Sequence, residues 1–130
     1  MPIFERGQTV RVPFPHTDRS TRQRRPALVV SDGTIGAADS LLGVVMITSA
    51  ENRPWPGDVP LGDDLALAGL SATSVIRPCK IATVEAREVE ALGRVGAGVM
   101  SRVSERVRGY LGATTLIAVR TANEDAAPPT

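Results

Sequence analysis

The segment from Leu42 to Ser49 reads LGVVMITS, a continuous apolar run that ends in two hydroxyl residues. The segment from Ala27 to Ser31 reads ALVVS and has the same character. Short runs rich in β-branched residues and bounded by turn-forming residues are typical of strands buried on both faces. We therefore expect these two segments to form the centre of a β-sheet.

Further strands are expected on both sides of this pair. Residues Gln8 to Pro15 alternate between apolar and other side chains, and the prolines near the end place this strand at an edge or terminus of the sheet. Ser74 to Glu85 (SVIRPCKIATVE) predicts a long strand with a bulge or bend at Pro78, and Glu88 to Val95 predicts a weaker final strand. The first two thirds of the chain is therefore expected to be β.

One segment is predicted to be helical. Apolar residues from Met100 to Leu111 recur at close to the ~3.6-residue period of a helix. Ser101 is the expected N-cap, and Gly112 is the expected glycine just beyond the C-terminus. Residues 113–120 fit a strand or a helix equally well. Several strands followed by one late helix predict a mainly β fold, a small SH3-like barrel with a C-terminal α-helix.

Length and composition limit the classes of protein to consider. The chain has 130 residues, a net charge of +1 and a mean hydropathy of +0.00. No apolar run approaches the ~20 residues of a membrane helix, and the first residues do not resemble a signal peptide. We expect one domain over residues 1–120, a flexible tail over residues 121–130, no membrane association and a cytoplasmic location.

The chain has one cysteine, Cys79, and one histidine, His16. A single cysteine cannot form an internal disulfide, and one Cys with one His cannot supply the ligands of a tetrahedral zinc site. The number of Asp and Glu residues still permits a carboxylate site for Mg²⁺ or Mn²⁺. We expect neither a metal nor another cofactor.

Basic residues are concentrated between the first two expected strands. Pro15 to Pro26 reads PHTDRSTRQRRP and carries four arginines against one aspartate, a local charge of +3. Arginine presents a rigid fork of hydrogen-bond donors that suits phosphate groups. This segment predicts a cationic loop that contacts a phosphate backbone. The alternative is a solvated surface loop, with an arginine content that only reflects genome composition.

Other candidates rest on single features. Thr48 and Ser49 end a buried strand, where hydroxyls commonly cap the next turn, while Arg77 and Lys80 lie on the bent strand, where charges are commonly exposed. Trp55 lies between two prolines, where it could stack on a base or close the end of the barrel. Taken alone, these features do not separate functional roles from structural ones.

Four blocks of sequence, in order, resemble the MazF/PemK family of type II toxins, within the Kid/CcdB-like superfamily. The blocks are RRPALVVS at 24–31, VMITS at 45–49, SVIRPCKIAT at 74–83, and the helix end with its Leu-Gly at 107–112. The resemblance extends from about residue 5 to residue 112, and the ordered set is more specific than any one block.

The resemblance implies an SH3-like barrel that forms a homodimer and is inhibited by a cognate antitoxin. A cationic groove that accepts RNA also accepts an acidic, partly disordered peptide, so we expect the antitoxin to block the groove with such a segment. The resemblance also implies a metal-independent, sequence-specific endoribonuclease (an mRNA interferase) that cuts single-stranded RNA and arrests growth. The catalytic residues carried over from the family motifs are Arg25 and Thr48. The other polar candidates are assigned to RNA binding; they are His16, Arg19, Arg22, Arg24, Ser49, Arg77 and Lys80.

RNA chemistry fits the two catalytic candidates in part. The 2′-OH of RNA can attack the adjacent phosphorus in line, so the protein must hold an unstacked backbone and neutralise charge on the phosphoryl oxygens. Arg25 suits the second task but a guanidinium is a poor proton shuttle, and the hydroxyl of Thr48 can orient the 2′-OH but is a weak base. The general base and acid remain unassigned, with His16 or a water molecule as candidates.

The alternative is a non-catalytic SH3-like module, or a decayed toxin, that binds protein or nucleic acid without cleaving it. Arg25 and Thr48 in matching motifs favour the enzyme. Some relatives carry an acidic residue about two positions after the arginine of the bent strand, whereas this chain has Cys79 there. The missing carboxylate favours the alternative. We expect Cys79 to be a small, semi-buried residue. Base choice by an enzyme would depend on the loops around residues 16–24 and 50–58.

Overall fold

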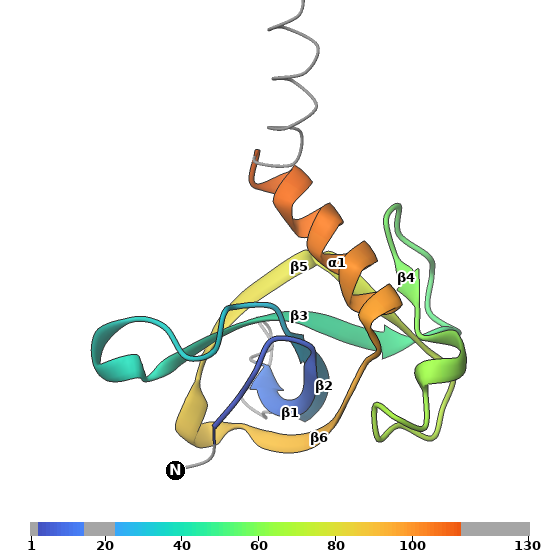
Figure 1. The fold of residues 1–130 in the computed structure, drawn as a ribbon. Helices are drawn as coiled ribbons and strands as arrows, with labels where there is room; N and C mark the ends of the chain where they lie inside the picture. Colours follow the sequence, from blue (N-terminus) through green and yellow to red (C-terminus); the bar gives the residue numbers. More distant parts are fainter. Residues whose placement is uncertain (1–2, 15–22, 113–130) are drawn as a thin grey trace, which may run out of the picture.

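The computed structural model describes residues 3–14 and 23–112. Within these ranges the elements are β1 (Gln8–Phe14), β2 (Gln23–Val29), η1 (Ala37–Asp39), β3 (Leu41–Ser49), β4 (Val59–Pro60), η2 (Gly62–Asp64), β5 (Ser74–Glu85), η3 (Ala86–Glu88), β6 (Glu90–Arg94) and α1 (Ala97–Tyr110). The strands form one antiparallel sheet in the order β4-β5-β3-β2-β1-β6. The sheet curls into an open barrel, and α1 packs against β4 and β5 (Figure 1). The predicted mainly β fold with a C-terminal helix is confirmed.

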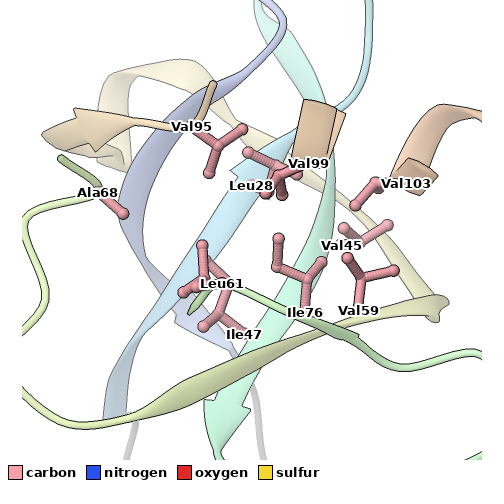
Figure 2. Packing of buried hydrophobic residues seen from close by; sticks show 10 residues of the cluster. All are labelled: Leu28, Val45, Ile47, Val59, Leu61, Ala68, Ile76, Val95, Val99 and Val103. Carbon is pink, nitrogen blue, oxygen red and sulfur yellow. The ribbon is translucent and has the colours of Figure 1, made fainter. Parts of the chain in front are cut away.

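The sheet is covered by hydrophobic side chains on both faces. The first core lies on one face and consists of Phe4, Val10, Val12, Ala27, Val29, Leu42, Val44, Met46 and Ala86. The second core lies on the other face and consists of Leu28, Val45, Ile47, Val59, Leu61, Ala68, Ile76, Val95, Val99 and Val103 (Figure 2). β3 contributes residues 42, 44 and 46 to the first core and residues 45 and 47 to the second, so the predicted strand buried on both faces is confirmed.

β2 begins earlier than the sequence pattern predicts. Arg24 and Arg25 were expected in the cationic loop, but they lie inside the strand and pair with β1. Pairing of β2 with β3 ends at Ala27, so the segment that contains Pro26 is paired on one side only. A proline is tolerated in such a position because no second ladder needs its missing N–H. Pairing with β1 therefore extends β2, and the pattern of apolar residues along β2 gives no sign of this pairing.

β5 contains the predicted irregularity. Met46 of β3 pairs with Arg77, and the preceding residue Val45 pairs with Ile81, so the residues numbered 78–80 have no partner on β3. This bulge at Pro78 lets one long strand bend around the barrel (Figure 1). The final strand, β6, is shorter than predicted and is preceded by the 3-10 helix η3.

α1 begins four residues before the predicted N-cap. Ser101 lies inside the helix, and the N-cap position is held by Gly96, whose backbone N–H donates to Asp64 Oδ2 at 2.8 Å. The prediction of Ser101 as N-cap is wrong because the helix begins at Ala97, next to a contact between Gly96 and Asp64, which is distant in sequence. Gly112 has a φ of 85°, which confirms it as the left-handed residue after the helix.

Some expectations concern residues outside the described part of the chain. These are the strand or helix over 113–120, the tail over 121–130 and the loop that contains His16. In the described residues, no helix is long and apolar enough to span a bilayer.

Candidate functional site

The β2–β3 ladder ends at the pair formed by Ala27 and Met46. Two residues further along their strands, on the same face of the sheet, are Arg25 and Thr48. Continuing the antiparallel register places these two residues opposite each other, just beyond the last pair. Both are half-buried. The two predicted catalytic residues, 23 positions apart in sequence, therefore lie at one end of the face that carries the first core.

The turn after β3 fixes the Thr48 hydroxyl. Asn52 Nδ2 donates to Thr48 Oγ1 at 2.6 Å. Ser49 faces the other side of the sheet, because side chains alternate along β3, and its Oγ accepts the backbone N–H of Glu51 at 3.1 Å. The structure thus brings Thr48 but not Ser49 to the face of Arg25. Asn52 was not among the predicted residues. The only feature of the sequence that points to it is its position, a polar amide in the turn just after the hydroxyl residues that end β3.

Arg77 is buried on the same face as Met46, its partner in the ladder, and only 6% of its surface is exposed. Its Nε and Nη2 donate to the two carboxylate oxygens of Asp58, both at 3.1 Å, and Nη2 also donates to the carbonyl of Arg53 at 2.8 Å. The expectation that charges on the bent strand face solvent is therefore wrong for Arg77. Asp58, 19 positions earlier in the chain, supplies the counter-charge that permits burial.

Trp55 covers this ion pair. The guanidinium carbon of Arg77 lies 4.2 Å from the centroid of the Trp55 ring, and Lys80 Nζ lies 5.9 Å from it. Lys80 and Cys79 are exposed, because both belong to the bulge that has no partner on β3. The expectation of a semi-buried Cys79 is wrong for this reason.

Arg24 lies on the face of β2 opposite to Arg25. Its Nη2 donates to the carbonyl of Glu88 at 3.1 Å and to that of Arg11 at 3.4 Å, which links β1 to the segment before β6. Arg24 is exposed and is not brought together with the Arg25–Thr48 pair. Three other predicted RNA-binding residues lie outside the described residues: His16, Arg19 and Arg22.

The donors at this end of the sheet suit an anionic, flexible ligand. These donors are the Arg25 guanidinium on β2, the Thr48 hydroxyl on β3 and the Asn52 amide in the turn after β3. The exposed ammonium of Lys80 lies on β5, the strand next to β3. Guanidinium and hydroxyl groups are frequent partners of phosphate oxygens. Over residues 3–14 and 23–112, no group of His, Cys, Asp or Glu side chains could hold a metal ion.

Comparisons with known proteins give the family and the fold. Residues 5–111 match the family model described as PemK-like, MazF-like toxin of type II toxin–antitoxin system. A MazE–MazF complex from Deinococcus radiodurans is similar at 25% identity and a TM-score of 0.63, over 86% of this chain and 98% of that one. No curated protein sequence matches the chain.

Two further structures share the fold at lower identity. MazF from Deinococcus radiodurans has 22% identity and a TM-score of 0.66, over 86% of this chain and 99% of that one. An endoribonuclease in complex with its cognate antitoxin from a mycobacterial species has 23% identity and a TM-score of 0.62, over 83% of this chain and 94% of that one. Because the family model spans residues 5–111 and so includes both halves of the site, the chain belongs to the PemK-like, MazF-like toxin family of type II toxin–antitoxin systems.

Proposed function

We propose that this toxin is an endoribonuclease that cleaves single-stranded RNA at specific sequences, with the RNA 2′-OH as nucleophile. The observation that supports the proposal is the end of the β2–β3 ladder at the pair Ala27 and Met46, because its register, continued by two residues, sets Arg25 opposite Thr48 on the same face. Both residues occupy positions of family motifs. RNA brings its own nucleophile, so the protein needs to align the backbone and stabilise charge rather than activate water.

In this proposal each residue has a limited task. Arg25 donates to the phosphoryl oxygens on which negative charge develops. The Thr48 hydroxyl contacts the 2′-OH or the phosphate, and its hydrogen bond with Asn52 fixes where that oxygen lies. Lys80, exposed on the bulge, contributes attraction for the RNA backbone. The groups that take up and deliver the proton stay unassigned, with His16 and water as candidates.

The proposed partners follow from the same site. Several similar structures are complexes of a toxin with an antitoxin. A cationic surface that accepts RNA also accepts an acidic, partly disordered peptide, which would block it. We therefore propose a cognate antitoxin of that chemistry, a homodimeric toxin, and action on mRNA in the cytoplasm.

The test is cleavage by matched variants. Purified protein is incubated with single-stranded RNA in EDTA, and product ends are sequenced. We expect cutting at a defined sequence, reduced about 10²–10³-fold by Arg25→Ala, because removal of one fixed charge-stabilising donor has about that effect. Arg94→Ala is the charge-matched control, since Arg94 is exposed on β6, two strands away from β2, and its loss should leave the rate near that of the parent.

Undiminished cutting by Arg25→Ala would contradict the assigned site. No cutting by the parent protein, together with retained RNA binding, would instead favour the non-catalytic module. Growth arrest on induction, reversed by a small acidic protein encoded next to the toxin, would separate a toxin from a decayed relative in cells.

A further inference from the structure

Residues 53–58 form a segment that is held against the sheet beside the candidate site. Arg77 donates to the Asp58 carboxylate and to the Arg53 carbonyl, and Asp58 Oδ2 also accepts the backbone N–H of Trp55 at 2.9 Å. The Trp55 ring lies 4.2 Å from the guanidinium carbon of Arg77. Both the backbone and the ring of Trp55 are therefore fixed by one buried ion pair.

This fixed ring remains accessible to a ligand. Trp55 is 40% exposed, although it is among the largest apolar side chains that a core could use. The Trp55 segment follows directly from the turn in which Asn52 contacts Thr48, so the ring belongs to the loop next to the proposed catalytic hydroxyl. Lys80 Nζ lies over the ring at 5.9 Å from its centroid, which places a positive charge close to the aromatic surface.

We propose that Trp55 is a base-stacking subsite, in which an unpaired RNA base stacks on the indole while Lys80 contacts the adjacent phosphate. Arg77 and Asp58 are then positioning residues that set the ring before RNA arrives. An aromatic platform beside a cation is the usual arrangement for single-stranded nucleic acid, and stacking on it contributes about 1–3 kcal/mol per base. The inference rests on the proposed function only for the identity of the ligand as RNA.

Fluorescence gives a direct test, because Trp55 is the only tryptophan in the chain. The probe is the cleaved RNA sequence made with 2′-O-methyl groups, which cannot supply the nucleophile; if no RNA is cut, a mixed-sequence pool of the same chemistry replaces it. We expect binding to quench Trp55 emission. A set of oligomers with one abasic position each should then locate a single base whose removal restores the emission.

Variants test the same subsite through cleavage. Trp55→Leu removes the ring but retains an apolar cover for Arg77, and we expect KM to rise on the order of 5- to 150-fold with kcat little changed. Trp55→Phe keeps an aromatic ring and should remain within a few-fold of the parent. Circular dichroism and Tm confirm that both variants are folded.

RNA that binds without quenching Trp55, or quenching that no abasic position relieves, would overturn the subsite even if the protein cuts RNA. An unchanged KM in Trp55→Leu would do the same, as would an effect confined to antitoxin binding. Base-dependent quenching without any cleavage would uphold the subsite and reject the proposed enzyme.

Discussion

Arg25 and Thr48 share one face of the sheet because of the strand register, whereas Arg24 and Arg25 lie on opposite faces although they are adjacent in sequence. Alternation along β2 sends the two arginines to opposite faces, where Arg24 binds backbone carbonyls and Arg25 lies on the face of Thr48. A count of basic residues in the segment from Pro15 to Pro26 cannot make this distinction, because side-chain direction depends on where the strand begins.

The hydroxyl at position 48 gives a prediction that separates chemistry from packing. Thr48→Val keeps the shape of the side chain but removes the oxygen that Asn52 contacts, so we expect kcat to fall about 10²-fold or more if that oxygen orients the reacting groups. Thr48→Ser keeps the oxygen and should retain most of the activity. Single-turnover rates at saturating RNA measure the effect; equal rates for Thr48→Val and the parent would remove this residue from the catalytic set.

The Arg77–Asp58 pair gives a prediction for stability. The two side chains are only 8% and 10% exposed, so loss of one partner leaves a buried charge without compensation. We expect Asp58→Ala to lower the free energy of unfolding by about 3–5 kcal/mol. The double variant Asp58→Ala with Arg77→Met should lose clearly less than the sum of the two single changes. Urea unfolding measures all four proteins, and strict additivity would show that the pair is not coupled.

β3 was predicted within one residue because its apolar run is a local property and both faces of the strand are buried. The start of β2 and the start of α1 could not be predicted in the same way. β2 is extended by pairing with β1, and α1 starts where Asp64 accepts the N–H of Gly96. Both boundaries are set by contacts between elements that are distant in sequence.

Two glycines give opposite predictions for the same substitution. A Cβ on Gly93 of β6 would overlap the carbonyl oxygen of Leu67 and lie 2.8 Å from the carbonyl carbon of Ala68, whereas a Cβ on Gly98 of α1 would meet nothing. We expect Gly93→Ala to lower the free energy of unfolding by about 1–3 kcal/mol, because two backbones must separate.

Gly98→Ala is the matched control and should raise the free energy of unfolding by up to about 1 kcal/mol, since alanine favours the helix. Thermal and urea unfolding of the two variants measure the difference. A Gly93→Ala protein as stable as the parent would show that the close approach between β6 and residues 67–68 is not needed for the fold.

At the scale of the whole molecule, the residues of the candidate site come from β2, β3, β5 and the segment between β3 and β4. The mainly β fold and the resemblance to a toxin family could be predicted from ordered sequence blocks, and the family is confirmed by the match over residues 5–111. The roles of Asn52 and Asp58 could not be predicted, because each is recognisable only from its partner across the fold. The catalytic assignment of Arg25 and Thr48 remains a prediction.

The nucleophile can be tested with two RNA oligomers of the mapped target sequence. One carries ribose throughout, and the other has a single 2′-deoxy nucleotide immediately 5′ of the cleaved bond. Mass spectrometry of the products in EDTA should find a 2′,3′-cyclic phosphate and a 5′-hydroxyl from the first oligomer and no cut at that bond in the second. Cleavage of the deoxy oligomer at the same bond and rate would contradict attack by the 2′-OH at the Arg25–Thr48 site.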